Sequence, residues 1–323
     1  MQEALRTLAG IGLASVISLS GEAAFAKDVV LGYVPASLEY PYNVATAKGF
    51  EEQAKELGAK TIVIDPRGSV EKQANAIDDL VAQGAQGIAA LTLDGVVGQT
   101  WVDKLAEQNI PFVSVATQIG DPTKVAWSDV YPKLAALVGM DNVRAGELSG
   151  ELAAAMLPKD HAVKIAIIEG APGYPQVWQR TNGFKQGLDK AGIKYQIVAS
   201  QPTDWTPEKG EAVCQNVLTA TPDLDLIFSQ ADDMAIGCRR ALDAAGSKVK
   251  LVATGGGSKL GIGAVQAGEI DGSVCDRPEH EGRLAAKALY EAVTNPNAKR
   301  AQLISYDTPK VTKETIGECP PEW

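Results

Sequence analysis

The sequence predicts an α/β protein made of two similar doubly wound parallel-sheet lobes joined by a hinge. Two observations favour this fold class. Short β-branched runs alternate with amphipathic stretches along almost the whole chain, and the chain repeats its own turn residues in two successive halves. Parallel strands need crossover connections, so the alternation indicates sheets with helices on both faces. The 323 residues, 45% of them hydrophobic, suffice for two ordinary domains.

The alternation defines nine strands and several helices. The predicted strands are residues 29–34, 61–65, 87–91, 112–115, 164–168, 195–199, 226–229, 249–253 and 272–275. The helical stretches between them include residues 44–57, 70–83, 177–191, 208–219 and 233–245.

The internal repeat is seen most clearly after the first strand of each half. Tyr40-Pro41 precedes Gly49-Phe50 by the same distance as Tyr174-Pro175 precedes Gly183-Phe184. Ligands of doubly wound sheets bind outside the carboxyl ends of the strands. We therefore expect the loops 35–43 and 170–178 to face one cleft.

The same repeat sets the predicted domain boundaries. One lobe comprises residues 27–140 plus about 277–304, and the other comprises residues 141–276 plus about 305–323. No flexible Gly/Ser linker separates the halves, so the crossing near Met140-Asp141-Asn142 is interpreted as a hinge.

The first 26 residues have the pattern of a secretory signal peptide. Arg6 precedes an apolar run from Leu8 to Leu19, and Ala24-Phe25-Ala26 supplies small residues at the spacing of a cleavage site. An ordinary N-terminal amphipathic helix is the alternative. No Cys near Ala26 offers a lipid attachment point, and no other segment reaches the ~20 apolar residues of a membrane span. We expect a free periplasmic protein, cleaved after Ala26.

Composition argues against several other classes of protein. The net charge is −10 and Lys and Arg are scattered, so no nucleic-acid partner is expected. His161 and His280 are the only histidines, and we expect both on the solvated surface rather than in a metal or catalytic site. The glycine cluster 254–259 fits neither phosphate-binding fingerprint and is interpreted as a turn at the cleft edge. No cofactor and no catalytic residue are predicted.

Four segments, Leu38 to Tyr42, Trp178 to Phe184, Ser200 to Trp205 and Ile227 to Gly237, give the chain a resemblance to a known family. In order and spacing they resemble the ribose-type periplasmic binding proteins of sugar importers. The resemblance implies the type I periplasmic-binding-protein fold and a monomer that captures a small sugar or polyol for the membrane permease of an ABC importer. The alternative is a sensor that docks on a chemoreceptor or receptor kinase without transport. A sugar-responsive repressor would need a basic DNA-reading headpiece instead of a signal peptide.

The resemblance also implies which residues contact the ligand. Positions matching Tyr42 and Trp205 sandwich the sugar ring, and the position matching Arg180 donates to its hydroxyls. Aromatic faces suit the C–H faces of a sugar, and forked charged donors suit its hydroxyl rim. Asn43, Asp276 and Tyr40 fall at further ligand positions. Packing of Tyr40 and Tyr42 against the sheet, and a surface role for Arg180, are the alternatives.

Three departures from the family pattern remove hydroxyl-reading groups. Ala116-Thr117 stands in place of an Asp-Arg pair, Ala231 in place of an Asn, and Gly256 in place of an Asp. Ribose itself is therefore in doubt, and we expect compensation from Gln118, Asp232, Trp178 or Trp127, the last within the added segment 120–133. The predicted ligand-binding residues are Tyr40, Tyr42, Asn43, Thr117, Trp178, Arg180, Trp205, Gln230, Asp232 and Asp276.

The four cysteines of an exported chain permit two disulfides, in three possible connectivities. Cys214 and Cys238 lie on successive predicted helices, whereas Cys275 ends a strand near the place to which the tail with Cys319 returns. We predict the pairs 214–238 and 275–319. Four buried thiols would be the alternative.

Overall fold

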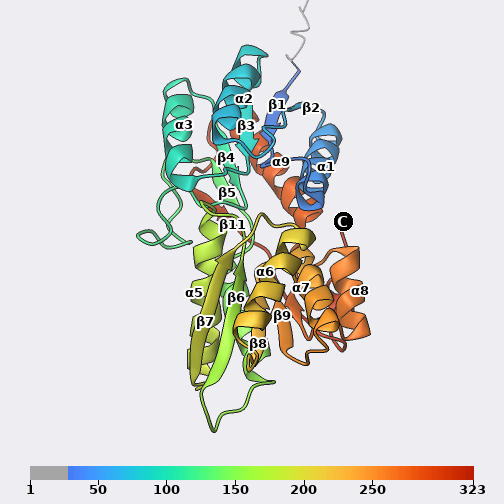
Figure 1. Cartoon of the computed structure of the whole chain (residues 1–323). Coiled ribbons are helices and arrows are strands. Elements are labelled where there is room, and N and C mark those ends of the chain that lie inside the picture. The colour runs from blue at the N-terminus through green and yellow to red at the C-terminus, as the bar shows by residue number, and fades with distance from the viewer. Residues whose placement is uncertain (1–27) are drawn as a thin grey trace, which may run out of the picture.

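The computed structural model describes residues 28–323 and shows two lobes, one above the other, with the C-terminal end near their boundary (Figure 1). The predicted signal peptide and its cleavage site after Ala26 lie outside the described residues. No helix of the described part of the chain is long and apolar enough to cross a bilayer.

The sheet of the first lobe has six strands, all parallel, in the order β11-β5-β4-β3-β1-β2. β1 lies between β2 and β3, so the loops after β1 and β3 diverge at the carboxyl edge. This divergence is the switch point at which ligands of such sheets bind. The strands are β1 (Val30–Val34), β2 (Lys60–Val63), β3 (Gly87–Ala90), β4 (Phe112–Val115), β5 (Ala136–Val138) and β11 (Gln302–Ile304).

The sheet of the second lobe has the parallel order β7-β6-β8-β9 and repeats the switch point between β6 and β8. A short antiparallel pair, β10 with β12, continues beside β9 through the isolated bridge Val252 to Gly272. The strands are β6 (Val163–Glu169), β7 (Tyr195–Pro202), β8 (Leu226–Ser229), β9 (Lys250–Ala253), β10 (Ser273–Val274) and β12 (Lys310–Val311).

The helices pack on both faces of the two sheets, as the strand and helix alternation predicted. Buried aliphatic residues form a separate core layer on each face of each sheet. The helices are α1 (Pro41–Glu56), α2 (Val70–Ala82), α3 (Gly95–Glu107), α4 (Asn142–Ala154), α5 (Pro175–Lys190), α6 (Pro207–Ala220), α7 (Asp232–Ala244), α8 (Lys259–Ala267), α9 (Pro278–Thr294) and the 3-10 turn η1 (Ile316–Glu318).

The helices that face the cleft are paired through close backbone contacts. A Cβ on Gly49 of α1 would lie 2.0 Å from the carbonyl oxygen of Glu279 in α9. In the second lobe, a Cβ on Gly183 of α5 would lie 1.9 Å from the carbonyl oxygen of Val143 in α4. Real Cβ atoms do not approach an oxygen so closely, so glycine at these positions fixes how α9 sits on α1 and α4 on α5.

All nine predicted strands exist, and their ends differ from the prediction by at most three residues. β5, β11 and β12 were not predicted. β5 has three residues, all buried, so it shows no polar-apolar alternation, and it directly follows the turn-rich segment 120–133. Two strands of two or three residues near the end of the chain give too short a pattern to recognise.

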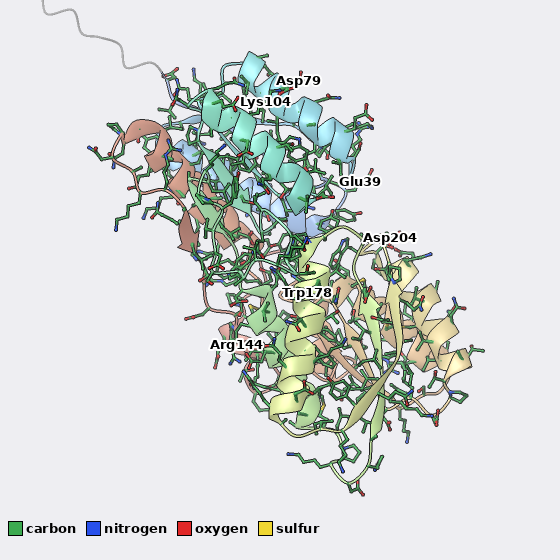
Figure 2. The ribbon with its side chains drawn as sticks, turned by 90° about the vertical axis from the view of Figure 1, so that its left-hand side faces the viewer. Glu39, Asp79, Lys104, Arg144, Trp178 and Asp204 are labelled. Atoms are coloured by element: carbon green, nitrogen blue, oxygen red, sulfur yellow. A yellow bond between two sulfur atoms is a disulfide. The ribbon has the colours of Figure 1, made fainter. Side chains whose placement is uncertain are left out.

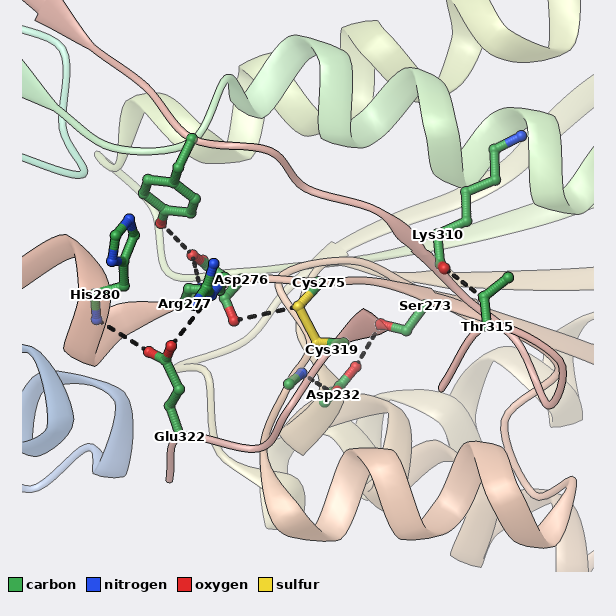
Figure 3. The surroundings of a disulfide bond; sticks show 12 residues. Asp232, Ser273, Cys275, Asp276, Arg277, His280, Lys310, Thr315, Cys319 and Glu322 are labelled. Carbon is green, nitrogen blue, oxygen red and sulfur yellow. Dashed lines mark hydrogen bonds and ion pairs between the residues drawn. A yellow bond between two sulfur atoms is a disulfide. The ribbon is translucent and has the colours of Figure 1, made fainter. Parts of the chain in front are cut away.

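Both predicted disulfides are confirmed. Cys214 joins Cys238, with 5.2 Å between their Cα atoms, and Cys275 joins Cys319, with 5.8 Å between theirs. The second bond ties the chain after η1 to the end of β10, beside Asp276 (Figure 3). Glu322 then accepts hydrogen bonds from the backbone N–H groups of Glu279 and His280. The segment 319–323 is thereby held against both lobes.

Candidate functional site

A cavity of about 110 Å³ lies between the lobes at the carboxyl ends of both sheets. Loops after β1, β3 and β4 supply one side, and loops after β6, β7, β8 and β9 supply the other. Met140 and Asn142 add to the lining from the crossing between the lobes. Its lining is Ala36, Tyr40, Tyr42, Asn43, Leu91, Ala116, Met140, Asn142, Tyr174, Gln176, Arg180, Trp205, Ala231, Asp232, Asp233, Gly255, Asp276, Glu281 and Trp323.

The first-lobe wall is built on α1 and α9. Tyr42, in the first turn of α1, donates from its hydroxyl to Glu281 Oε2 of α9 over 2.7 Å. Its ring meets the indole of Trp323 edge to face, with 5.8 Å between the centroids. Pro41 is the first residue of α1, a position at which its missing N–H leaves no hydrogen bond unmade. Tyr42 therefore lies in the first turn of the helix, next to the loop after β1.

The second-lobe wall is built around Arg180 of α5, which is 8% exposed. Its Nε donates to Asn142 Oδ1 over 2.8 Å and its Nη1 donates to the carbonyl oxygen of Gln230 over 2.5 Å. Its Nη2 lies 3.9 Å from Asp276 Oδ2. Arg180 is therefore no surface cation, because its guanidinium joins the hinge, β8 and β10 while one edge remains at the cavity.

Trp205 completes this wall from the loop after β7. Its backbone has φ +70°, a conformation that side chains with a Cβ seldom adopt and that concentrates at functional sites. Its ring lies over Gly170, where a Cβ would come within 1.9 Å of the indole. Tyr174 packs on the ring edge to face at 5.6 Å, and the guanidinium of Arg180 lies 5.9 Å from the ring centroid. These contacts and packing against the second-lobe core hold the indole in place.

Asp276 and Glu281 share the hydroxyl of Tyr306, which lies 2.6 Å from Asp276 Oδ1 and 2.9 Å from Glu281 Oε2. One hydroxyl carries one proton, so it serves both carboxyl groups only when one of them is itself protonated. Burial raises the pKa of Glu281 to about 8, with the charge of Asp276 as the next cause. Burial also raises the pKa of Asp276, against the opposing effect of Arg180. Because Arg180 opposes the shift at Asp276, Glu281 is the carboxyl group of this pair whose protonated form is favoured.

Asp232 is a further buried carboxyl group in the second lobe. Its Oδ1 accepts from Ser273 Oγ over 2.7 Å and its Oδ2 accepts from the N–H of Gly257 over 3.2 Å (Figure 3). Burial raises its pKa to about 6. A Cβ on Gly256 would lie 2.7 Å from both Asp232 oxygens, so this carboxylate occupies the space beside Gly256.

Seven of the ten predicted ligand-binding residues line the cavity, and three do not. Thr117 is buried behind it, where its Oγ1 accepts from Gln176. The side-chain amide of Gln230 accepts from the N–H of Gly170 and donates to the Val177 carbonyl and the Thr181 hydroxyl. Trp178 is 40% exposed on the outer side of α5, where Figure 2 labels it at the surface. The seven are Tyr40, Tyr42, Asn43, Arg180, Trp205, Asp232 and Asp276.

Other expectations about side chains fail. Gln118 does not reach the cavity, because its amide donates to the carbonyls of Val125 and Ala126 and accepts from Gln179. Trp127 is buried within the added segment instead of lining the cavity. His280 is half-buried and packs edge to face on Tyr306 rather than lying free in solvent, whereas His161 is exposed.

Sequence reasoning missed several lining residues that matter chemically. Glu281 has no counterpart in the motifs and is brought in by α9, more than 230 residues beyond Tyr42. Trp323 arrives through the disulfide-tied tail, and its carbonyl accepts from the N–H of Lys259. Only Tyr174 and Gln176 carried a usable signal, because they stand in the repeated loop opposite Tyr40 and Tyr42.

The two lobes touch directly around the cavity. Gln176 of α5 donates to the carbonyl of Ala116 and to Thr117 in the loop after β4, both over 3.2 Å. Gln179 donates to Gln118 over 2.7 Å. Ala36, Leu91, Leu93 and Ala116 form an apolar patch that receives Tyr42 and Tyr174. Within residues 28–323, no group of three or more His, Cys, Asp or Glu side chains is arranged to hold a metal ion.

Comparison with known proteins identifies the family. The sequence model of the protein family described as "Periplasmic binding protein domain" matches residues 31–297. The chain belongs to this family of periplasmic binding proteins. It is 29% identical over 262 residues to the ribose import binding protein of Bacillus subtilis (strain 168), with 81% of each chain covered. It is 30% identical over 296 residues to the D-allose-binding periplasmic protein of Escherichia coli (strain K12), covering 90% of this chain and 92% of that protein.

A solved structure supports the same family assignment. The Caulobacter myo-inositol binding protein bound to myo-inositol superposes with a TM-score of 0.79 at 25% identity, over 90% of this chain and 95% of that one. The predicted fold class, the resemblance to the ribose-type proteins and the assignment to binding proteins rather than enzymes are confirmed.

Proposed function

We propose that the protein captures a small sugar or polyol in the cavity between its lobes and delivers it to the membrane permease of an ABC importer. The observation that carries the proposal is the lining itself. Aromatic rings stand on both walls, Tyr42 with Trp323 and Tyr174 with Trp205, and buried polar groups lie between them. Rings suit the apolar faces of a sugar, and convergent polar groups suit its hydroxyls.

The proposed ligand contacts are the seven predicted residues that line the cavity, joined by Glu281, Tyr174, Gln176 and Trp323. The relatives named for ribose, D-allose and myo-inositol support a small polyhydroxylated ligand. The departures at Ala116-Thr117, Ala231 and Gly256 argue against ribose, because they remove polar groups from the lining.

The remaining parts of the proposal concern transport. Export through the signal peptide 1–26, a periplasmic location and a monomeric state suit a carrier that meets a permease. We place the lobe boundaries near residues 140, 277 and 305. These boundaries suit the pairing of β11 with β5 in the first lobe and of β12 with β10 in the second. The chain would then cross between the lobes three times at one hinge. A ligand that prefers the closed arrangement would then shift the population of lobe positions.

A thermal-shift screen of pentoses, hexoses, amino sugars and polyols tests the proposal. A ligand that binds only the folded protein stabilises it by about 2.7 kcal/mol at ~100 Kd, which the melting temperature reports. We expect one class to bind with Kd on the order of micromolar, about −8 kcal/mol, and to make the scattering profile more compact. No stabilisation by any member, or an identical scattering profile with a proven ligand, would contradict it. Import of that ligand should fail in a strain that lacks the protein, which separates transport from sensing.

A further inference from the structure

The cavity is richer in hydrogen-bond acceptors than a neutral sugar needs. Glu281 is fully buried, and its Oε1 has no partner among residues 28–323. Within the same residues, Asn43 Oδ1 and Gln176 Oε1 are also buried and unpaired. Asp276 Oδ2 makes no hydrogen bond to described residues and has only Arg180 Nη2 at 3.9 Å. A sugar hydroxyl can donate once while it also brings lone pairs that need donors.

The charges of the lining point the same way. Four carboxyl groups line the cavity, those of Asp232, Asp233, Asp276 and Glu281, and Arg180 is the one cationic side chain among the lining residues. The donors of Arg180 are already directed to Asn142, to the Gln230 carbonyl and toward Asp276. Arg180 is therefore the single cation beside four carboxyl groups, and burial of Glu281 and Asp232 favours their protonated forms where no further cation is present.

The aromatic rings fit a cation as well as a sugar face. Tyr42 and Trp323 meet on one side and Tyr174 and Trp205 on the other. Ring faces attract a desolvated cation through their quadrupole. The indole N–H groups of Trp205 and Trp323 are buried without partners in the described chain, which leaves two donors for ligand oxygens. The lining as a whole suits a ligand that has hydroxyls and one positive group.

We propose that the ligand carries a protonated amine, as an amino sugar or an aminocyclitol does, and that its ammonium group binds against the carboxyl groups of Asp276 and Glu281. An ammonium group offers three donors and no acceptor. It supplies a positive charge to balance the carboxylates, and it supplies the hydrogen-bond donor that Glu281 Oε1 lacks. This inference rests on the proposed capture of a sugar or polyol and names the class within it.

The proposal makes binding depend on pH with a defined sign. The groups that face Glu281 are Tyr42 from α1, Tyr33 from β1, Asp276 after β10, Arg180 from α5 and Tyr306 after β11. Burial first, and then Asp276, raises the pKa of Glu281 to about 8 in the empty protein. A bound ammonium stabilises the ionised acid, so binding at neutral pH releases a proton and the affinity rises as pH approaches 8. A neutral ligand that accepts from protonated Glu281 would show the opposite slope.

Calorimetry on matched ligand pairs tests the proposal. The pairs are D-glucose with D-glucosamine, D-galactose with D-galactosamine, and myo-inositol with an aminodeoxy-inositol, and the N-acetyl sugars keep the nitrogen without its charge. In at least one pair the amine should bind about tenfold or more tightly than its hydroxyl partner, a difference of about 1.4 kcal/mol. The N-acetyl form should lose this advantage. Titrations in buffers of different ionisation enthalpy should show proton release for the amine.

Two variants assign the effect to the cavity. Glu281→Gln keeps the shape and removes the charge, so the amine should lose about tenfold more affinity than its hydroxyl partner loses. Glu291→Gln removes the same charge from an exposed position on α9 and should change neither. Equal or tighter binding of the hydroxyl member in every pair, or an amine affinity that Glu281→Gln leaves unchanged, overturns this inference and leaves the proposed function standing. Binding of no member of any pair and of no sugar in the screen overturns both.

Discussion

The two lobes present the cavity with the same pair of helices, built twice. α1 and α5 each follow a Tyr-Pro step, begin at the Pro and run for 16 residues. Each is crossed by a partner helix, α9 or α4, through glycines whose Cβ would strike the facing backbone. The difference lies in the charges. Six residues after the N-cap, the first lobe has Thr46 and the second has Arg180.

The partner helices reverse this difference. Beside the contact glycine Gly282, α9 carries Glu281, whereas α4 carries Ala145 beside Gly146. Among these four helices, the carboxyl group in the cavity thus comes from the partner helix of the first lobe, and the cation comes from the repeated helix of the second. The comparison teaches that the scaffold is symmetric in its packing residues and that the binding site is asymmetric in its charges.

The largest effect is expected from removing the cation of the second lobe. Arg180→Ala leaves Asp276 and the Gln230 carbonyl buried without their cation, which should cost about 3–5 kcal/mol of unfolding free energy. Thr46→Ala removes only a hydroxyl bond to the Tyr42 carbonyl and should cost roughly 0.5–1.5 kcal/mol. Urea unfolding measures both. Equal losses in the two variants would show that the two positions are equivalent after all.

The helix packing that the two lobes share was predictable from the sequence, whereas the charged residues in which they differ were predictable only in part. Tyr-Pro steps and Gly-Phe pairs recur at fixed spacing, so both helices and both facing loops could be predicted. Arg180 and Trp205 came from a family motif. Glu281 and Trp323 carry no motif and reach the cavity through long-range packing and a disulfide, which local patterns do not encode.

The two disulfides should stabilise alike and act differently on the ligand. They span 24 and 44 residues, so replacing either pair by Ala should cost about 3–4 kcal/mol of unfolding free energy. Only loss of 275–319 frees the tail that brings Trp323 to the cavity, so only that variant should also weaken binding. Calorimetry on the two paired variants separates these effects, and an equal loss of affinity in both would contradict the role of the tail.

The acid of the first lobe should make the stability depend on pH. An acid whose pKa is raised by folding stabilises the folded state least when it is forced to ionise. The stabilising contribution of Glu281 should therefore fall as pH rises from its unfolded pKa, roughly 4.3, toward its folded pKa of about 8. Glu281→Gln should flatten this fall in denaturation curves taken across that range. A slope that remains on the acidic side of about pH 6 is expected from the other buried carboxyl groups, Asp232 among them. An unchanged slope near pH 8 would show that Glu281 ionises normally.

The glycines test whether the two helix crossings are equivalent. Gly49→Ala and Gly183→Ala each push a methyl group into facing backbone and should each cost about 1–3 kcal/mol. Gly263→Ala lies in α8 with nothing within 4 Å and should instead stabilise by about 0.4–1 kcal/mol. Thermal unfolding compares the three, and a neutral result at either crossing would mean that its helices can separate at little cost.

Affinity for the identified ligand in variants of the two walls tests most directly whether the site lies between the lobes. Tyr42→Ala removes a ring from the first lobe, Trp205→Ala removes one from the second, and Trp178→Ala removes one outside the cavity. Calorimetry should give a ten- to hundredfold loss for each wall variant, about 1.4–2.7 kcal/mol, and wild-type affinity for Trp178→Ala. Wild-type affinity in either wall variant, or a large loss in Trp178→Ala, would contradict binding between the two walls.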